Sequence, residues 1–257
     1  MFKILTGAGA IPALLMLLAT LVSPARAALP TYISAALADP ARPLQDRSRD
    51  RDRKPAEVLA FGGVRPGARV ADFMSGGAYF TRLLSRIVGD SGHVYAFLPE
   101  EELKNCAPQE TAGTRAIEHD SRYANVTVLR SPVNRFDSPE PLDLIWTAQN
   151  FHDLYDAFMG PADVPALSRS LYRALKPGGI LLVIDHVAAA DSGTRDTGTL
   201  HRIDPEVIVR EALAAGFELD ARSDLLRNPG DTHRLRVFDP SIRGRTDQVI
   251  LRFRKPR

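Results

Sequence analysis

One stretch, residues 70–81, constrains the fold of this chain more than any other part of its sequence. Its first four residues, VADF, are mostly apolar and follow the turn-forming pair Pro66-Gly67, which predicts a buried strand. Gly76 and Gly77 come next, and their lack of a Cβ suits a sharp turn or a close approach of the backbone to a ligand. The stretch therefore predicts a strand that ends in a tight glycine turn.

A helix is predicted directly after this turn. Leu83, Leu84, Ile87 and Val88 have the spacing of residues that share one face of a helix. The first N–H groups of a helix have no partner within it, and the helix dipole is positive at that end. The strand, turn and helix together can therefore hold an oxygen-rich ligand.

The rest of the chain alternates strands with helices, which predicts an α/β fold. Further strands are expected at residues 93–98, 125–129, 142–147, 180–184, 217–225 and 248–253, and further helices at residues 55–61, 165–175 and 205–215. This order predicts a doubly wound, mostly parallel sheet of seven strands. Because no helix separates the last two strands, they are expected to form an antiparallel pair at one edge of the sheet.

The first 27 residues have the features of a secretory signal peptide. Lys3 gives the basic start, residues 11–19 the short apolar core, and Ala25-Arg26-Ala27 the cleavage site. A membrane anchor is the alternative, but the apolar core is shorter than the roughly 20 residues that a spanning helix needs. We therefore expect cleavage after Ala27, an exported protein in the periplasm or cell exterior, and no membrane span in the mature chain.

The mature chain is expected to form one domain with a short extension. Residues 28–54 are predicted to be this N-terminal extension, and the mixed charges of residues 42–54 are typical of a solvated segment. Residues 55–257 form the predicted domain. The formal net charge of +2 is in effect that of Lys3 and Arg26; the remaining chain is near neutral with interspersed charges, which argues against a nucleic-acid-binding surface. Cys106 is the only cysteine, so an intrachain disulfide is excluded.

Two features together resemble the class I S-adenosylmethionine-dependent methyltransferases: the glycine turn, and the sequence Leu-Lys-Pro-Gly-Gly at residues 175–179 before an all-apolar strand. The resemblance extends over about residues 55–253 and implies the Rossmann-like methyltransferase fold with S-adenosylmethionine as cofactor. More narrowly, four short motifs resemble an exported bacterial group of predicted methyltransferases, at residues 76–81, 149–154, 201–204 and 244–247.

The resemblance also implies which residues bind the cofactor. In the family the turn has the form G-x-G-x-G; here Gly76 matches the middle glycine, and Met74 and Ala78 occupy the outer positions. A carboxylate for the ribose hydroxyls is expected after the second strand, and Glu100 is the candidate. Asp72 could instead accept hydrogen bonds from the amides of the turn. The implied cofactor contacts are Asp72, Met74, Ser75, Gly76, Gly77, Tyr79 and Glu100.

The loop after the fourth strand carries the candidate catalytic groups. In such folds ligands bind beyond the carboxyl ends of the strands, where residues 147–156 are expected to lie. A base is needed when the methyl acceptor is a hydroxyl or a protonated amine, and His152 is the candidate, oriented by Asp153 or Asp156. The predicted catalytic set is His152, Asp153 and Asn150. The alternative is that Asn150 and Asp153 only cap the following helix.

Four of the six histidines could converge at this edge of the sheet: His152, His186, His201 and His233. Their convergence would allow a metal site as an alternative, but none of them has the short spacing of a known metal-binding motif, so no metal ligand is assigned.

These patterns predict an exported methyltransferase that uses S-adenosylmethionine and acts on a small molecule. Two other hypotheses stay open. The first is a non-catalytic ligand-binding protein on the same scaffold, which Met74 and Ala78 in the turn would favour. The second is a nicotinamide-dependent oxidoreductase, which the Leu-Lys-Pro-Gly-Gly stretch and the late strand pair disfavour.

Overall fold

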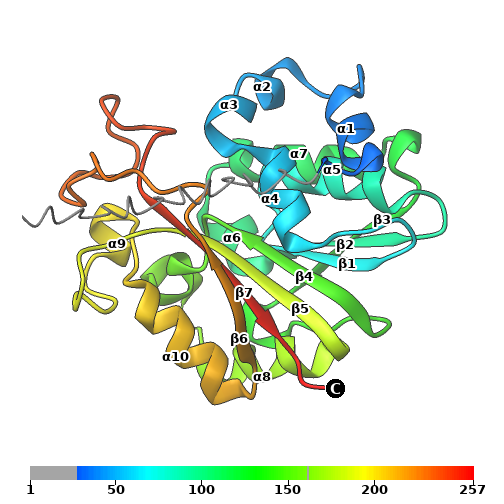
Figure 1. The fold of residues 1–257 in the computed structure, drawn as a ribbon. Helices are drawn as coiled ribbons and strands as arrows, with labels where there is room; N and C mark the ends of the chain where they lie inside the picture. The colour runs from blue at the N-terminus through cyan, green and yellow to red at the C-terminus, as the bar shows by residue number, and fades with distance from the viewer. Residues whose placement is uncertain (1–27, 161) are drawn as a thin grey trace, which may run out of the picture.

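The computed structural model describes residues 28–160 and 162–257, so the predicted signal peptide lies outside the described residues. A seven-stranded sheet with the order β3-β2-β1-β4-β5-β7-β6 forms its centre (Figure 1). Strands β1 to β5 pair in parallel, whereas β7 is antiparallel to both β5 and β6. The predicted fold, including the antiparallel C-terminal pair, is confirmed. The strands are β1 Arg69–Phe73, β2 His93–Pro99, β3 Val126–Ser131, β4 Leu142–Ala148, β5 Leu175–His186, β6 Glu218–Ser223 and β7 Gln248–Arg254.

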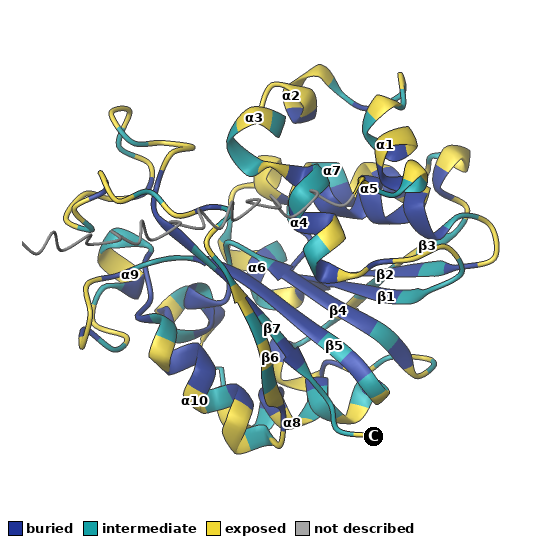
Figure 2. Ribbon diagram, in the orientation of Figure 1, coloured by how far each residue is buried: buried dark blue, intermediate teal, exposed yellow. Residues whose placement is uncertain are grey.

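Helices cover both faces of the sheet. On one face, α8 and α10 pack over a core that contains Phe73, Phe97 and Leu251. On the other face, α1, α4 and α5 cover a second core around Val70 and Trp146. Figure 2 shows the buried centres of the strands between these two layers. The α-helices are α1 Thr31–Ala38, α2 Leu44–Arg47, α3 Asp50–Arg53, α4 Pro55–Gly62, α5 Tyr79–Val88, α6 Glu100–Asn105, α7 Pro108–Ile117, α8 Val164–Ala174, α9 Thr197–Leu200 and α10 Pro205–Ala215.

Local sequence signals explain where several helices begin and end. Helix α4 has Pro55 in its first turn and ends at Gly63, whose φ of 74° is a left-handed conformation that glycine adopts easily. Helix α10 begins at Asp204, whose side chain accepts a hydrogen bond from the N–H of Glu206. The predicted helices at residues 55–61, 165–175 and 205–215 are all present within a residue or two.

The Leu-Lys-Pro-Gly-Gly stretch belongs to the fifth strand itself, whereas it was expected to precede that strand. Strand β5 already begins at Leu175 and pairs there with Leu142 of β4. The register shifts before the next pair, Leu144 with Ile180, because the intervening residues form a bulge in which Gly178 has a φ of 78°.

The charged segment at residues 42–54 is not simply solvated, and this prediction was wrong in part. Asp46 is buried and accepts a hydrogen bond at 2.7 Å from the buried Nε of Arg82, which lies on α5. Arg42 is also buried, and its guanidinium pairs with Asp50. The charges are paired because the segment folds back over α5, outside the helical layer (Figure 1). Arg51, whose side chain is 87% exposed, keeps the predicted solvated character.

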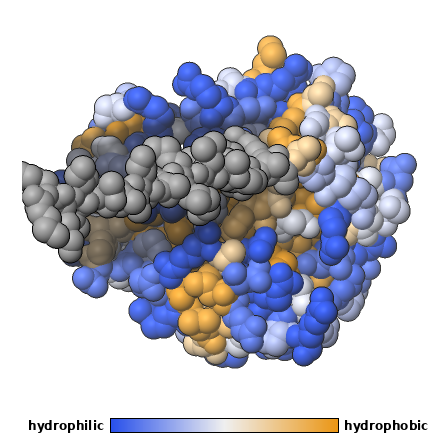
Figure 3. All heavy atoms as spheres, in the orientation of Figure 1, coloured by the Kyte–Doolittle hydropathy of each residue, from blue (hydrophilic) through white to orange (hydrophobic). Residues whose placement is uncertain are grey.

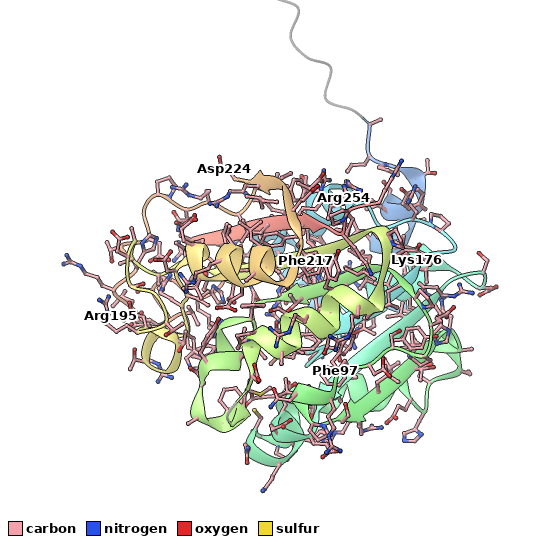
Figure 4. All side chains as sticks on the ribbon, turned by 90° about the horizontal axis from the view of Figure 1, so that it is seen from below. Phe97, Lys176, Arg195, Phe217, Asp224 and Arg254 are labelled. Carbon is pink, nitrogen blue, oxygen red and sulfur yellow. The ribbon has the colours of Figure 1, made fainter. Side chains whose placement is uncertain are left out.

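The surface is mixed in polarity, and the face shown in Figure 3 intersperses hydrophilic and apolar residues. Within the described ranges, every helix is too short or too polar to cross a bilayer. Figure 4 shows Arg195, on the loop between β5 and α9, pointing away from the body of the protein, while Phe97 and Phe217 lie inside it.

Candidate active site at the carboxyl ends of the strands

A cavity of about 510 Å³ lies at the carboxyl ends of β1, β2 and β4. Its size is within the range of small-molecule sites, about 300–1,000 Å³. The glycine turn, the start of α5, helices α6 and α7, and the loop after β4 all contribute to its wall. Nine of the ten residues predicted for the site line this cavity: Asp72, Met74, Ser75, Gly76, Gly77, Tyr79, Asn150, His152 and Asp153.

The glycine turn keeps its backbone shape although two of its glycine positions are occupied by other residues. Met74 and Ala78 have φ angles of 59° and 62°, and Gly76 has a φ of 48°, so all three adopt left-handed conformations. A left-handed conformation costs a non-glycine residue roughly 1–2 kcal/mol. Both side chains are buried, Met74 in the core beside β1, which offsets part of that cost. Met74 and Ala78 therefore adopt left-handed conformations in this turn although neither is a glycine.

Asp72, at the end of β1, is bonded to helix α5 rather than to the amides of the glycine turn. Its Oδ2 accepts a hydrogen bond at 2.6 Å from the hydroxyl of Thr81. Burial raises the pKa of Asp72 to about 7, although its hydrogen bonds to Thr81 act in the opposite direction. Asp72 thus holds the strand end against the helix and also faces the cavity.

Helix α7 packs directly onto the glycine turn. The hydroxyl of Thr114 donates a hydrogen bond at 2.8 Å to the carbonyl of Gly76. At Gly113, a Cβ atom would lie only 2.0 Å from the carbonyl oxygen of Gly77. No local pattern in the sequence predicts that α7 packs on the glycine turn.

Glu102, and not the predicted ribose carboxylate Glu100, lines the cavity. Glu100 is exposed at the start of α6 and does not line the cavity. Glu102 is buried in the wall, and its Oε2 has no hydrogen-bond partner among the described residues. Burial, and then the nearby charges of Asp153, Glu110 and Asp72, raise the pKa of Glu102 to about 7. Helix α6 begins directly after β2, so its turn directs the third of three consecutive glutamates, Glu102, toward the ligand site.

Asn150 connects the loop after β4 to the glycine turn. Its side-chain amide donates a hydrogen bond at 2.6 Å to the carbonyl of Met74. The 3₁₀ helix that follows, His152–Tyr155, has no side-chain cap. The alternative role of Asn150 and Asp153 as helix caps is therefore not found.

His152 is bonded to Asp185 and also contacts Asp153, one of the two aspartates predicted to orient it. The Nδ1–H of His152 donates to Oδ1 of Asp185 at 2.7 Å, and its backbone N–H donates to Oδ2 at 2.8 Å. Asp153 lies on the other side of the ring, with Oδ1 at 3.2 Å from Nε2. Burial lowers the pKa of His152, but the charges and hydrogen bonds of both aspartates outweigh it and raise the pKa well above its usual value.

Three of the four histidines converge. The ring of His152 lies 5.4 Å from the ring of His201 and 6.1 Å from that of His186, measured between centroids. Burial and the neighbouring charge of His152 lower the pKa of His186 well below its usual value, and its Nδ1 lies 2.8 Å from the hydroxyl of Thr246. His233 pairs with Asp247 and lies outside the cavity wall.

The N-terminal segment closes part of the cavity. Arg53 of α3 lines it, and its guanidinium carbon lies 4.5 Å from the centre of the Tyr79 ring. Nη2 of Arg53 donates a hydrogen bond to the side-chain oxygen of Gln149. Burial and the neighbouring charge of Arg49 lower the pKa of Arg53 to about 9, so it remains a cation at neutral pH. Nothing in the sequence distinguishes Arg53 from the other residues of its charged run.

Comparison with solved structures identifies the fold. A S-adenosylmethionine-dependent methyltransferase from Aquifex aeolicus superposes with a TM-score of 0.54 at 19% identity, over 80% of this chain and 98% of that protein. The chain has the Rossmann-like fold of S-adenosylmethionine-dependent methyltransferases. The [4+2]-cyclase SpnF shares it, with a TM-score of 0.57 at 18% identity over 80% of each chain. The fold alone therefore does not determine the reaction.

Sequence comparison gives relatives within this fold. The chain is 29% identical over 191 residues to the ubiquinone/menaquinone biosynthesis C-methyltransferase UbiE of Vibrio campbellii, covering 74% of this chain and 62% of that protein. It is 34% identical over 131 residues to the UbiE protein of Shewanella woodyi, covering 50% of this chain and 46% of that protein. The chain thus spans about half to three fifths of the length of these relatives. No protein-family model matches the chain.

Proposed function

We propose that the protein is a S-adenosylmethionine-dependent methyltransferase that acts on a small molecule. The main observation behind this proposal is that the glycine turn and His152 line the same cavity, and that the ring of His152 is bonded to the buried Asp185. The similarity to UbiE methyltransferases over most of the chain supports it.

Residues of this chain match the chemical groups of the cofactor. Glu102 offers an unpartnered carboxylate oxygen to the ribose hydroxyls, and the turn at residues 74–77 approaches the ligand with its backbone. Arg53 brings a cation that suits the carboxylate of the methionine part. The aromatic ring of Tyr79 also lines the cavity, where a ring face can stabilise a sulfonium cation. When bound, the cofactor supplies the methyl group on that sulfonium.

His152 is placed to take a proton from the acceptor. Because its Nδ1–H is engaged by Asp185, His152 presents the lone pair of Nε2 to the cavity when the ring is neutral. Asp185 and Asp153 raise the pKa of His152 well above its usual value, so the neutral base forms only at a correspondingly high pH. An acceptor hydroxyl or ammonium would give its proton to this nitrogen while the methyl group passes to the acceptor and S-adenosylhomocysteine leaves. Phe158, Val237 and Phe238 form an apolar part of the wall, which favours an acceptor with an apolar portion.

We also propose that the protein acts outside the cytoplasm, because the sequence of residues 1–27 has the features of a cleavable signal peptide. Cell fractionation followed by N-terminal sequencing tests this. A mature protein that starts at Ala28 in the periplasm or medium is expected, and an uncleaved protein confined to the cytoplasm would contradict it.

Calorimetric titration with S-adenosylmethionine, S-adenosylhomocysteine and NAD tests the proposed reaction class. Heat of binding is expected with the first two and not with NAD. Binding of NAD alone would favour the oxidoreductase hypothesis. No heat with any of the three would contradict both enzyme functions and leave the ligand-binding hypothesis.

A further inference from the structure

Two histidines and one carboxylate form a compact triangle of ligand atoms in the cavity wall. Nε2 of His152 lies 3.3 Å from Nδ1 of His201 and 3.2 Å from Oδ1 of Asp153. The remaining side of the triangle, between Nδ1 of His201 and Oδ1 of Asp153, is 3.6 Å. All three residues line the same cavity.

These separations match the geometry of a metal centre. Two atoms that bind one transition-metal ion at about 2.0–2.2 Å, in a tetrahedral arrangement, are about 3.3–3.6 Å apart. All three sides of the triangle lie within about 0.1 Å of that range. The separations between the three atoms are therefore those expected of ligands to one ion.

Asp185 prepares His152 for this role. A histidine that binds a metal commonly donates its other ring N–H to a carboxylate, which fixes the tautomer and the orientation of the ring. Here Nδ1–H of His152 donates to the fully buried Asp185, whose Oδ1 also accepts the backbone N–H of His186. The lone pair of Nε2 is thereby directed at the other two ligand atoms.

The position of His201 is fixed by the residue that follows it. Arg202 is completely buried, and its guanidinium donates to the carbonyls of Val187 and Leu235 and pairs with Asp231 at 2.8 Å. His201 itself has a left-handed φ of 54°, and its backbone N–H donates to Thr197. A site built on such anchored backbone is preorganised.

We propose that His152, Asp153 and His201 bind a divalent transition-metal cation, with the remaining coordination positions open to the cavity. Two imidazoles and one carboxylate suit cations such as Zn²⁺, Fe²⁺ or Co²⁺, whereas Mg²⁺ and Ca²⁺ prefer oxygen ligands. The side chains of Asp153 and His201 are 18% and 21% exposed, which leaves room for water or an oxygen atom of the substrate. The site does not depend on the proposed methyl transfer, but while a cation occupies it His152 cannot serve as the base in that reaction.

The competing explanation is a hydrogen-bonded trio with no metal, in which protonated His152 donates to Asp153 or His201. The two arrangements exclude each other, because a cation on Nε2 occupies the lone pair that a proton would need. Metal binding therefore decides whether His152 acts as a ligand or as a base.

The experiment is a calorimetric titration of the chelator-treated, untagged protein with ZnCl₂, CoCl₂ and MgCl₂. We expect a single saturable site for Zn²⁺ and Co²⁺, no comparable binding of Mg²⁺, and a visible absorption spectrum of bound Co²⁺ that reports nitrogen and oxygen ligands. His201→Gln and Asp153→Asn are expected to weaken binding at least about 10-fold, since each removes a ligand. His119→Gln, at an exposed histidine far from the triangle in the sequence, is the matched control and should leave binding unchanged.

Absence of a saturable site for both Zn²⁺ and Co²⁺ would overturn the proposal, as would binding that the His201 and Asp153 variants leave unchanged. If a variant fails to fold, the Co²⁺ spectrum of the unsubstituted protein still tests whether the bound ion has nitrogen and oxygen ligands. Titration of the same samples with S-adenosylmethionine reports separately on the proposed function, so the failure of one proposal is distinguishable from the failure of the other.

Discussion

Oδ1 of Asp185 accepts a hydrogen bond from Nδ1 of His152 at 2.7 Å, and the other carboxylate oxygen accepts the backbone N–H of the same histidine. The two residues come from different strand ends. β4 and β5 pair in parallel up to Ala148 and Ile184, so the residues that follow them emerge side by side at the same edge of the sheet. The register of two parallel strands therefore creates the buried pair at the centre of the candidate active site.

Asp185→Asn is predicted to abolish most turnover while leaving the affinity for S-adenosylmethionine within a few-fold. The carboxylate accepts three N–H groups, from His152 twice and from His186, and an amide cannot accept all three because its NH₂ faces a donor. We expect at least about a 10-fold loss of activity and a decrease in unfolding free energy of about 1–3 kcal/mol.

Formation of S-adenosylhomocysteine across a panel of acceptors, calorimetric titration and thermal unfolding measure these effects. Asp191→Asn, at an exposed loop position, is the control. Full activity of the Asp185 variant would show that the orientation of His152 is not needed.

Arg53→Gln is predicted to weaken binding of S-adenosylmethionine about 10- to 100-fold. A hydrogen bond to a charged group contributes about 1.5–3 kcal/mol, and Arg53 lines the cavity with its guanidinium carbon 4.5 Å from the centre of the Tyr79 ring. Arg51→Gln is the matched control, since Arg51 lies on the same short helix with its side chain 87% exposed. Equal dissociation constants for the two variants would remove Arg53 from the cofactor site.

The fold could be predicted from the sequence because each strand and helix carries its own local pattern. The site could be predicted only where its residues follow such an element directly. His152 follows β4 and the glycine turn follows β1, and both were found. His201 lies 49 residues after His152; the sequence predicts that the two could converge, but it does not predict the contact between their ring nitrogens. No local pattern indicates the ion pair of Asp46 and Arg82, which holds the N-terminal segment against α5.

Glu102 shows that the sequence alone could not identify which glutamate faces the cavity. Three consecutive glutamates follow β2, and composition cannot distinguish which of them faces inward. The start of α6 decides it, because residues one and two positions apart on a helix point in different directions. Glu100 is exposed, the side chain of Glu101 accepts the N–H of Val133, and Glu102 faces the cavity.

Gly113→Ala is predicted to destabilise the protein by more than about 2 kcal/mol and to eliminate cofactor binding. The added Cβ would lie 2.0 Å from the backbone oxygen of Gly77, which cannot move without deforming the turn. Urea unfolding and calorimetric titration measure both effects. Gly230→Ala is the control, because its Cβ would meet only a side-chain oxygen at 3.3 Å. A stable variant with unchanged affinity would mean that α7 does not hold the turn.

Glu102→Gln is predicted to stabilise the protein at pH 8 but not at pH 4.5. Burial raises the pKa of Glu102 from 4.5 to about 7, so the folded state retains its proton between these values while the unfolded state loses it. The unfolded state therefore binds fewer protons there, and the contribution of Glu102 to stability falls as the pH rises from 4.5 to 7 and then stays constant. Glutamine does not titrate and avoids this loss.

The expected gain at pH 8 is roughly 1–3 kcal/mol, since each pKa unit corresponds to about 1.4 kcal/mol. Urea unfolding at both pH values measures it, and Glu100→Gln, at the exposed start of α6, is the control. The same substitution should weaken binding of S-adenosylmethionine, because a carboxylate accepts hydrogen bonds from ribose hydroxyls more strongly than an amide does. If the role of Glu102 is to bind S-adenosylmethionine, the variant should be more stable and should bind this cofactor more weakly. A variant that is stabilised and binds the cofactor as before would show that this buried carboxylate serves another purpose.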